Sequence, residues 1–106
     1  ELCYVEVKNV TLARDNVAQF PDAVTARGKK HLDELVEMVK QGHRAVMFFL
    51  VQREDTDTFK PAKDIDPLYA ETLKLAFENG VEILVYQASV GLEGIVIQRK
   101  LSFQLN

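Results

Sequence analysis

Apolar and polar side chains alternate strictly over residues 3–10, which is the period of a β-strand with two unlike faces. The polar face of this predicted strand carries two opposite charges, on Glu6 and Lys8. The other face is apolar and contains Cys3, Val5 and Val7. We expect Cys3 to be buried there as a small apolar side chain.

Two polar stretches predict long loops. The first follows Leu12 for about ten residues and contains Phe20-Pro21, where the proline disfavours helix at the residue before it. The second covers residues 53–63 and contains Pro61. Loops of this length in a small domain are often functional.

Two helices are predicted between the strands. The first spans residues 25–41, with a threonine as its cap and Gly42 as its stop. The second begins with Asp66 as cap and Pro67 at the first helical position, and it stops at residues 79–80. The apolar stripe of the first helix comprises Gly28, Leu32, Leu35, Val36 and Val39. We expect Gly28 to let this helix approach a sheet closely. The stripe of the second comprises Tyr69, Leu73, Ala76 and Phe77.

Further strands complete an α/β pattern. Residues 45–51 are apolar throughout, as in a strand buried on both faces of a parallel sheet. Residues 81–90 form another predicted strand, residues 91–94 a turn, and residues 95–105 a final strand. The order is strand, helix, strand, helix, strand, strand, which predicts parallel crossovers followed by an antiparallel hairpin in one mixed sheet.

Length and composition narrow the class of protein. The 106 residues fit a single domain, residues 1–106, because a second core would be crowded. Hydrophobic residues (47%) and charged residues (27%) are near the average, and no apolar run approaches the roughly 18 residues of a membrane helix. Membrane-spanning, disordered and collagen-like proteins are thereby excluded. Because the chain starts at Glu1 and is soon strand-like, we expect the N-terminal part of a longer protein to be missing.

Charge and cysteine content bear on the binding partners and on the cellular compartment. Thirteen basic and sixteen acidic residues give a net charge of −3, so any nucleic-acid site must be a local patch. The single cysteine cannot form an internal disulfide, and the chain shows no signal-peptide pattern. We therefore expect a cytoplasmic protein.

The Glu6–Lys8 pair is the first candidate for chemistry. On one strand face the two side chains lie about 7 Å apart along the chain. A carboxylate in this position can bind a metal ion, and the ammonium beside it can orient water or meet the charge of a phosphate. The alternative is a solvated ion pair, which contributes ~0–1 kcal/mol to stability.

The start of the first predicted helix is the second candidate. Arg27, Lys29 and Lys30 lie in its first turns, where the helix dipole disfavours cations. Backbone N–H groups and basic side chains at such a position can bind phosphate, although an ordinary solvated face is the alternative. His31 and His43 have no partner at metal-ligand spacing, so we expect cap or surface roles for them.

The sequences YVEVKNVTL and FPDAVTARGKKHLDEL, followed by FKPAKDIDPLYAETL and GVEILVY, resemble the sugar fermentation stimulation protein A family of bacteria and archaea. The resemblance covers nearly all of the chain to about residue 88. It implies a nuclease-like domain of the PD-(D/E)xK type, normally preceded by an OB-like domain. It also implies DNA binding and a regulatory role in sugar (maltose) utilisation.

The resemblance also suggests roles for particular residues. Glu6 and Lys8 match the (D/E)xK half-motif, and the backbone carbonyl of Val7 would be a further metal ligand, with Mg²⁺ or Mn²⁺ as the cofactor. The acidic half of the motif, on the preceding strand in such nucleases, is absent from this chain. Three functions stay open: a DNA-binding module without turnover, a magnesium-dependent nuclease in the full-length form, and a structural domain that forms homodimers.

Overall fold

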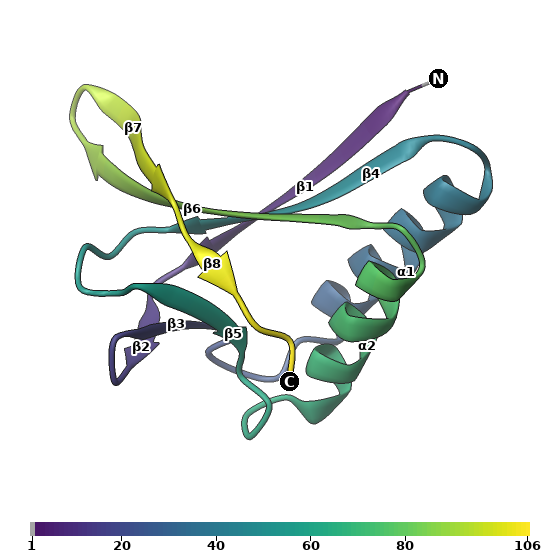
Figure 1. Cartoon of the computed structure of the whole chain (residues 1–106), viewed down its shortest axis with the longest axis horizontal. Helices are drawn as coiled ribbons and strands as arrows, with labels where there is room; N and C mark the ends of the chain where they lie inside the picture. Colours follow the sequence, from purple (N-terminus) through teal and green to yellow (C-terminus); the bar gives the residue numbers. More distant parts are fainter. Residues whose placement is uncertain (1) are drawn as a thin grey trace.

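The computed structural model describes residues 2–106 and contains two mixed four-stranded sheets and two helices (Figure 1). Sheet A has the strand order β1-β4-β6-β7 and sheet B the order β2-β3-β5-β8. The strands are β1 (Cys3–Val10), β2 (Leu12–Arg14), β3 (Val17–Phe20), β4 (Arg44–Val51), β5 (Thr58–Pro61), β6 (Glu82–Gly91), β7 (Gly94–Lys100) and β8 (Ser102–Phe103). The helices are α1 (Ala26–Lys40) and α2 (Pro67–Glu78).

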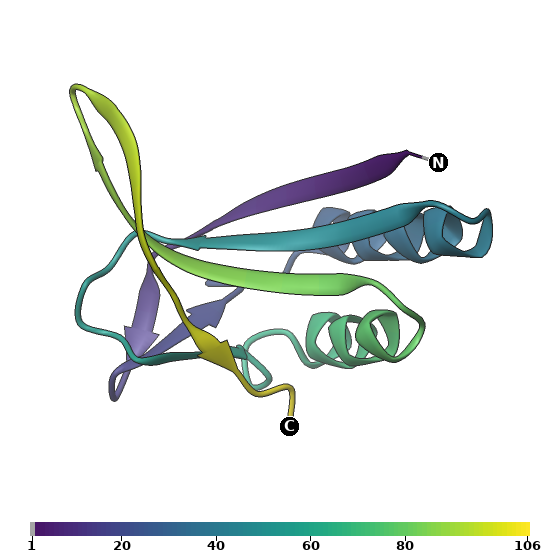
Figure 2. The ribbon, with the colours of Figure 1, turned by 45° about the horizontal axis from the view of Figure 1, so that its top comes forward.

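Sheet A confirms the predicted α/β order. Strands β1, β4 and β6 are parallel, α1 and α2 form the two crossovers, and β7 returns antiparallel to β6. Both helices lie on the same face of this sheet (Figure 2). The hydrophobic core fills the space between the helices and this face of the sheet. Its largest fully buried side chains include Tyr69, Phe49, Phe59, Leu32 and Met47.

Both predicted helix starts are confirmed. The Thr25 side chain accepts a hydrogen bond from the Gly28 N–H, and the Asp66 side chain accepts one from the Tyr69 N–H. Gly28 does permit a close approach, but the neighbour is the Tyr69 ring of α2 and not a sheet. Phe77, expected in the buried stripe of α2, is 46% exposed. No helix within residues 2–106 is long and apolar enough to cross a membrane.

Sheet B was not predicted, because most of its residues in β2, β3 and β5 lie within the two stretches expected to be loops. Strands β2 and β3 form a hairpin whose turn residues Asp15 and Asn16 have positive φ angles of 52° and 66°. Such angles are typical of the tight turns of β-hairpins. The second expected loop contains β5, and the final predicted strand divides at the buried Leu101 into β7 and β8.

Strand β1 has its two faces reversed relative to the usual arrangement. Cys3, expected to be buried, is exposed, and Val5 and Val7 are each 54% exposed. The reason is that both helices cover the opposite face of sheet A, toward which Glu6 and Lys8 project. A charged pair therefore occupies the side of the strand that an apolar pair would normally take.

Candidate metal and phosphate site

Glu6 and Lys8 form a close pair on the helix-facing side of β1. The Lys8 Nζ atom lies 3.4 Å from Glu6 Oε1. The Lys8 side chain is 15% exposed and the Glu6 side chain 34%, so this is not a solvated ion pair on an open strand. Charges in such a partly buried position interact more strongly than they would in water.

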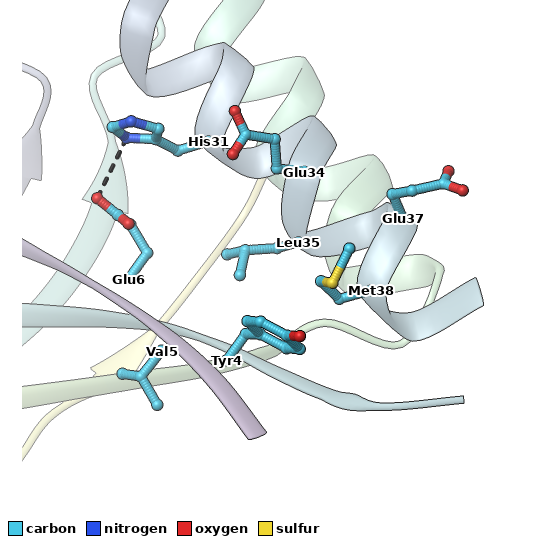
Figure 3. A pocket seen from close by; sticks show the side chains of 8 residues that line it. All are labelled: Tyr4, Val5, Glu6, His31, Glu34, Leu35, Glu37 and Met38. Carbon is cyan, nitrogen blue, oxygen red and sulfur yellow. Dashed lines mark ion pairs between the residues drawn. The ribbon is translucent and has the colours of Figure 1, made fainter. Parts of the chain in front are cut away.

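His31 of α1 completes the cluster. Its Nδ1 atom lies 2.8 Å from Lys8 Nζ. The same atom lies 3.1 Å from Glu6 Oε1, the ion pair drawn in Figure 3. The sequence predicted a cap or surface role for His31, but the structure places it against the charged pair. Spacing along the chain could not show this, because the contact joins residues 23 positions apart across a strand–helix crossover.

The His31 ring limits how the cluster can hold its protons. When Nδ1 carries no proton, it accepts a hydrogen bond from the Lys8 ammonium; when it is protonated, it donates to Glu6. One nitrogen cannot do both at once. The three side chains therefore have two alternative hydrogen-bond arrangements, one in which His31 is bonded to Lys8 and one in which it is bonded to Glu6. The side chain that is not bonded to His31 is the freer of the two to contact a ligand.

The backbone of β1 presents the Val7 carbonyl beside this cluster. The Arg44 N–H donates to the Leu2 carbonyl at 2.9 Å, and the Gln52 N–H donates to the Val10 carbonyl at 3.0 Å. Even-numbered residues of β1 thus direct their backbone polar groups to β4, and odd-numbered residues direct theirs to the other edge. Within residues 2–106 no strand pairs with that edge, so the Val7 carbonyl is directed outward there.

A cavity of about 330 Å³ opens between this edge and α1. Its floor is largely apolar, whereas exposed carboxylates of α1 stand on its rim. In Figure 3 Glu6 reaches toward His31, while Val5 points away from the helix. The lining residues are Tyr4, Val5, Glu6, His31, Glu34, Leu35, Glu37 and Met38.

Asp66 fixes the start of α1 over β1. This buried carboxylate, 4% exposed, accepts hydrogen bonds from the Thr25 N–H at 2.9 Å and from the Tyr69 N–H at 3.0 Å. Thr25 in turn caps α1 through the Gly28 N–H at 2.9 Å. One side chain thereby joins the N-termini of both helices, and it holds the helix that supplies His31.

The three basic residues of α1 do not form one patch. Lys29 makes an ion pair of 2.7 Å with Asp33 and lines the groove between α1 and α2. Arg27 lies one turn before His31 on the same helix face, and Lys30 lies one turn before the cavity residue Glu34. Both are exposed. Only Arg27 and Lys30 are therefore near the side of α1 that faces Glu6.

The donor set fits a hard divalent cation that keeps part of its water shell. Among residues 2–106 there is no group of three His, Cys, Asp or Glu side chains that could hold a metal. Mg²⁺ is usually bound by one or two carboxylates together with water and substrate phosphates. The Glu6 carboxylate and the Val7 carbonyl are oxygen donors of this kind, and they leave positions for water and phosphate.

A family model and several relatives match this chain. The model described as the sugar fermentation stimulation protein RE domain matches residues 1–94. A sugar fermentation stimulation protein homolog of Geotalea daltonii is 60% identical over 101 residues, which cover 95% of this chain and 44% of the relative. A homolog of Desulfotalea psychrophila is 60% identical over 94 residues, covering 89% and 40%. The chain spans less than half the length of these relatives.

A solved structure matches as well. The structure of Pyrococcus furiosus SfsA in complex with Ca²⁺ superposes with a TM-score of 0.88 at 35% sequence identity. The match covers 96% of this chain and 45% of that chain. The two proteins therefore share their fold over almost all of the present chain, and the protein from Pyrococcus furiosus binds a divalent cation.

Proposed function

This chain belongs to the sugar fermentation stimulation protein family, and from that membership we propose that it binds DNA at a nuclease-like site through a divalent cation. Glu6 and the Val7 carbonyl would hold the cation, Mg²⁺ or Mn²⁺. We extend the proposal to regulation of sugar utilisation, the process for which the relatives are named. Because this chain spans less than half the length of its relatives, the activity of the whole protein is likewise a proposal.

The observation that carries the proposal is the half-buried cluster of Glu6, Lys8 and His31 beside a strand edge that no strand within residues 2–106 pairs with. A charged cluster in this place costs desolvation energy, and local packing does not require it. The Ca²⁺ bound by the Pyrococcus furiosus protein supports a divalent cation in this fold.

Each residue has a distinct part in the proposed site. A bound cation supplies positive charge for phosphate oxygens and acts as a Lewis acid. Glu6 holds one side of it, Lys8 provides a second positive charge for the same phosphate, and His31 orients both side chains. Arg27 and Lys30 contact neighbouring phosphates of the backbone, without reading sequence.

Phosphodiester cleavage is the second candidate function. It is favoured by the Lys8 ammonium, which lies 3.4 Å from the Glu6 carboxylate and can stabilise charge that develops on a phosphate. Binding and cleavage differ in what they require of Lys8. Binding needs its charge only as one interaction among several, whereas cleavage depends on it.

The test separates metal binding from chemistry. Glu6→Gln should weaken Mn²⁺ and Mg²⁺ binding by roughly tenfold or more, because the amide loses the ligand charge. Lys8→Ala should leave metal affinity largely intact, lower DNA affinity, and abolish any cleavage. Calorimetry with each metal, DNA anisotropy with and without EDTA, and a nuclease assay measure these effects.

Two exposed residues of α2 provide matched controls. Glu71→Gln and Lys74→Ala make the same chemical changes on a different surface, and both should behave as wild type. Equal metal affinity of wild type and Glu6→Gln would contradict the metal site. Metal-dependent DNA binding without cleavage would select the binding module over the nuclease.

A further inference from the structure

The hairpin of β6 and β7 extends beyond the rest of sheet A, on the side away from both helices (Figure 2). All of residues 91–100 are exposed. Three consecutive aliphatic residues of β7, Ile95, Val96 and Ile97, have exposed fractions of 59%, 61% and 49%. Single exposed aliphatic side chains are common on protein surfaces, but a run of three on a projecting strand is typical of an interaction surface.

The root of this hairpin is fixed to the body of the protein. Gln98 has no partner in β6 and forms a β-bulge there. Beside the bulge, the Arg99 guanidinium donates hydrogen bonds to Gln87 Oε1 at 3.0 Å and to the Thr56 carbonyl at 2.7 Å. The exposed aliphatic run is therefore held by an anchored strand, and a partner would bind it without first having to order a loose segment.

The second edge of β7 is unpaired. This strand is the last of sheet A, and within residues 2–106 no strand pairs with its outer edge. Backbone N–H and C=O groups along such an edge readily bind another strand. Proline and charged side chains commonly prevent this, and the segment 95–97 contains neither. The exposed side chains and the backbone of β7 thus both favour the addition of a strand.

The charges of β7 make it complementary to a second copy of itself. Glu93 lies at the hairpin tip and Lys100 at the root, and neither makes an ion pair within residues 2–106. The bulge residue occupies no pairing position, so Glu93 and Lys100 each lie three positions from Val96. In antiparallel pairing about a two-fold axis at Val96, Glu93 of each copy lies opposite Lys100 of the other, and Ile95 lies opposite Ile97. Opposite-charge and aliphatic cross-strand pairs of this kind stabilise sheets.

We propose that β7 is a dimerisation edge, at which two copies of this chain pair antiparallel about Val96 and join their two A sheets into one. Symmetric pairing of one surface with itself is the commonest arrangement in homo-oligomers. It leaves β1, with Glu6 and Lys8, at each far end of the joined sheet. The dimer is therefore independent of the proposed function.

Val96→Lys and Val96→Glu test the two-fold axis. Each variant places two like charges opposite each other, so its dimer should have a dissociation constant at least about tenfold higher than that of wild type. An equimolar mixture of the two variants pairs opposite charges and should associate at least about tenfold more tightly than either variant alone. Sedimentation velocity over a concentration series measures these constants, and circular dichroism checks that both variants fold. A monomeric wild type, an unchanged constant in Val96→Lys, or a mixture no tighter than its components would overturn the proposal.

A charge exchange tests the same register without altering the aliphatic run. Glu93→Lys should weaken the dimer roughly tenfold, because it faces Lys100 of the second copy, and the addition of Lys100→Glu should restore most of the affinity. Val5→Lys is the control, since Val5 is similarly exposed but lies on β1 at the other edge of sheet A, and it should leave the dimer unchanged. Loss of the dimer in Val5→Lys, or no recovery in the exchanged variant, would overturn the proposal.

Discussion

Gly28 occupies a position in α1 at which a side chain has no room. A Cβ atom there would lie 2.8 Å from Thr25 Cγ2 and 3.1 Å from Tyr69 Cε1. Thr25 cannot move away easily, since its hydroxyl caps the helix through the Gly28 N–H. The glycine thus lets the cap and the buried tyrosine occupy the same turn.

Gly28→Ala should therefore destabilise the protein by about 1–3 kcal/mol, as overpacking of a core does. Helix propensity alone predicts the opposite, a gain of roughly 1 kcal/mol for alanine over glycine. Gly91→Ala is the control, because a Cβ atom there meets no atom within 4 Å. Urea unfolding measures the stability of the two variants. A Gly28→Ala variant more stable than wild type would show that the Thr25 and Tyr69 side chains shift easily to make room for the added methyl group.

The sequence predicts the site at this scale only in part. The alternation of residues 3–10 places Glu6 and Lys8 on one face, which the structure confirms. It does not show which face is covered, because the helices that decide this are more distant in sequence. For that reason Cys3 was wrongly expected to be buried, and His31 was not associated with the pair.

At the scale of elements, one carboxylate joins the two helices. Asp66 uses its two oxygens for different N–H groups, that of Thr25 before α1 and that of Tyr69 in α2. Capping side chains normally serve one helix. This residue therefore links the start of α1, the helix that carries His31, to the start of α2.

Asp66→Ala should lower the free energy of unfolding by about 2–4 kcal/mol, because two buried N–H groups lose their acceptor. Asp66→Asn should cost less, since its one carbonyl oxygen can retain one of the two bonds. Asp57→Ala, at an exposed carboxylate 3.7 Å from Arg99, should change stability by at most ~1 kcal/mol. Thermal or urea unfolding measures the series, and equal stability of Asp66→Asn and wild type would contradict the double role.

Long, strongly patterned elements were predicted well and short ones were not. The caps and stops of both helices follow from local chemistry, and the apolar run of β4 indicates a central strand. Strands β3 and β5, of four residues each, have too few positions for periodicity to be visible. They exist because they pair with each other across 41 residues, a pairing that no local pattern reveals.

At the scale of the whole molecule, the charge is negative and any attraction for DNA has to be local. The net charge is −3, and Glu34 and Glu37 stand on the rim of the cavity beside the candidate site. A cation bound at Glu6 would offset part of this negative field. The basic side chains that could help are Lys8 within the cluster and Arg27 and Lys30 on α1.

Replacing Arg27 and Lys30 together by glutamine should weaken binding to unrelated DNA duplexes alike, since interactions with phosphate carry no sequence information. The slope of log affinity against log salt should become shallower by roughly 0.9 for each phosphate that the variant no longer neutralises. Lys29→Gln is the matched control and should leave the slope unchanged, because Lys29 is paired with Asp33. Anisotropy titrations over a salt series measure the slopes, and equal slopes for all variants would mean that these side chains are merely solvated.

The reversed faces of β1 set stability against the proposed function. Sliding this strand by one residue would bury Val5 and Val7 and release Glu6 and Lys8 to water, an exchange that apolar burial favours. Selection for stability alone would therefore replace the charged pair with aliphatic residues, and a consensus or computational redesign would readily make the same choice. Stabilised versions of this domain are accordingly the ones most at risk of losing the candidate site.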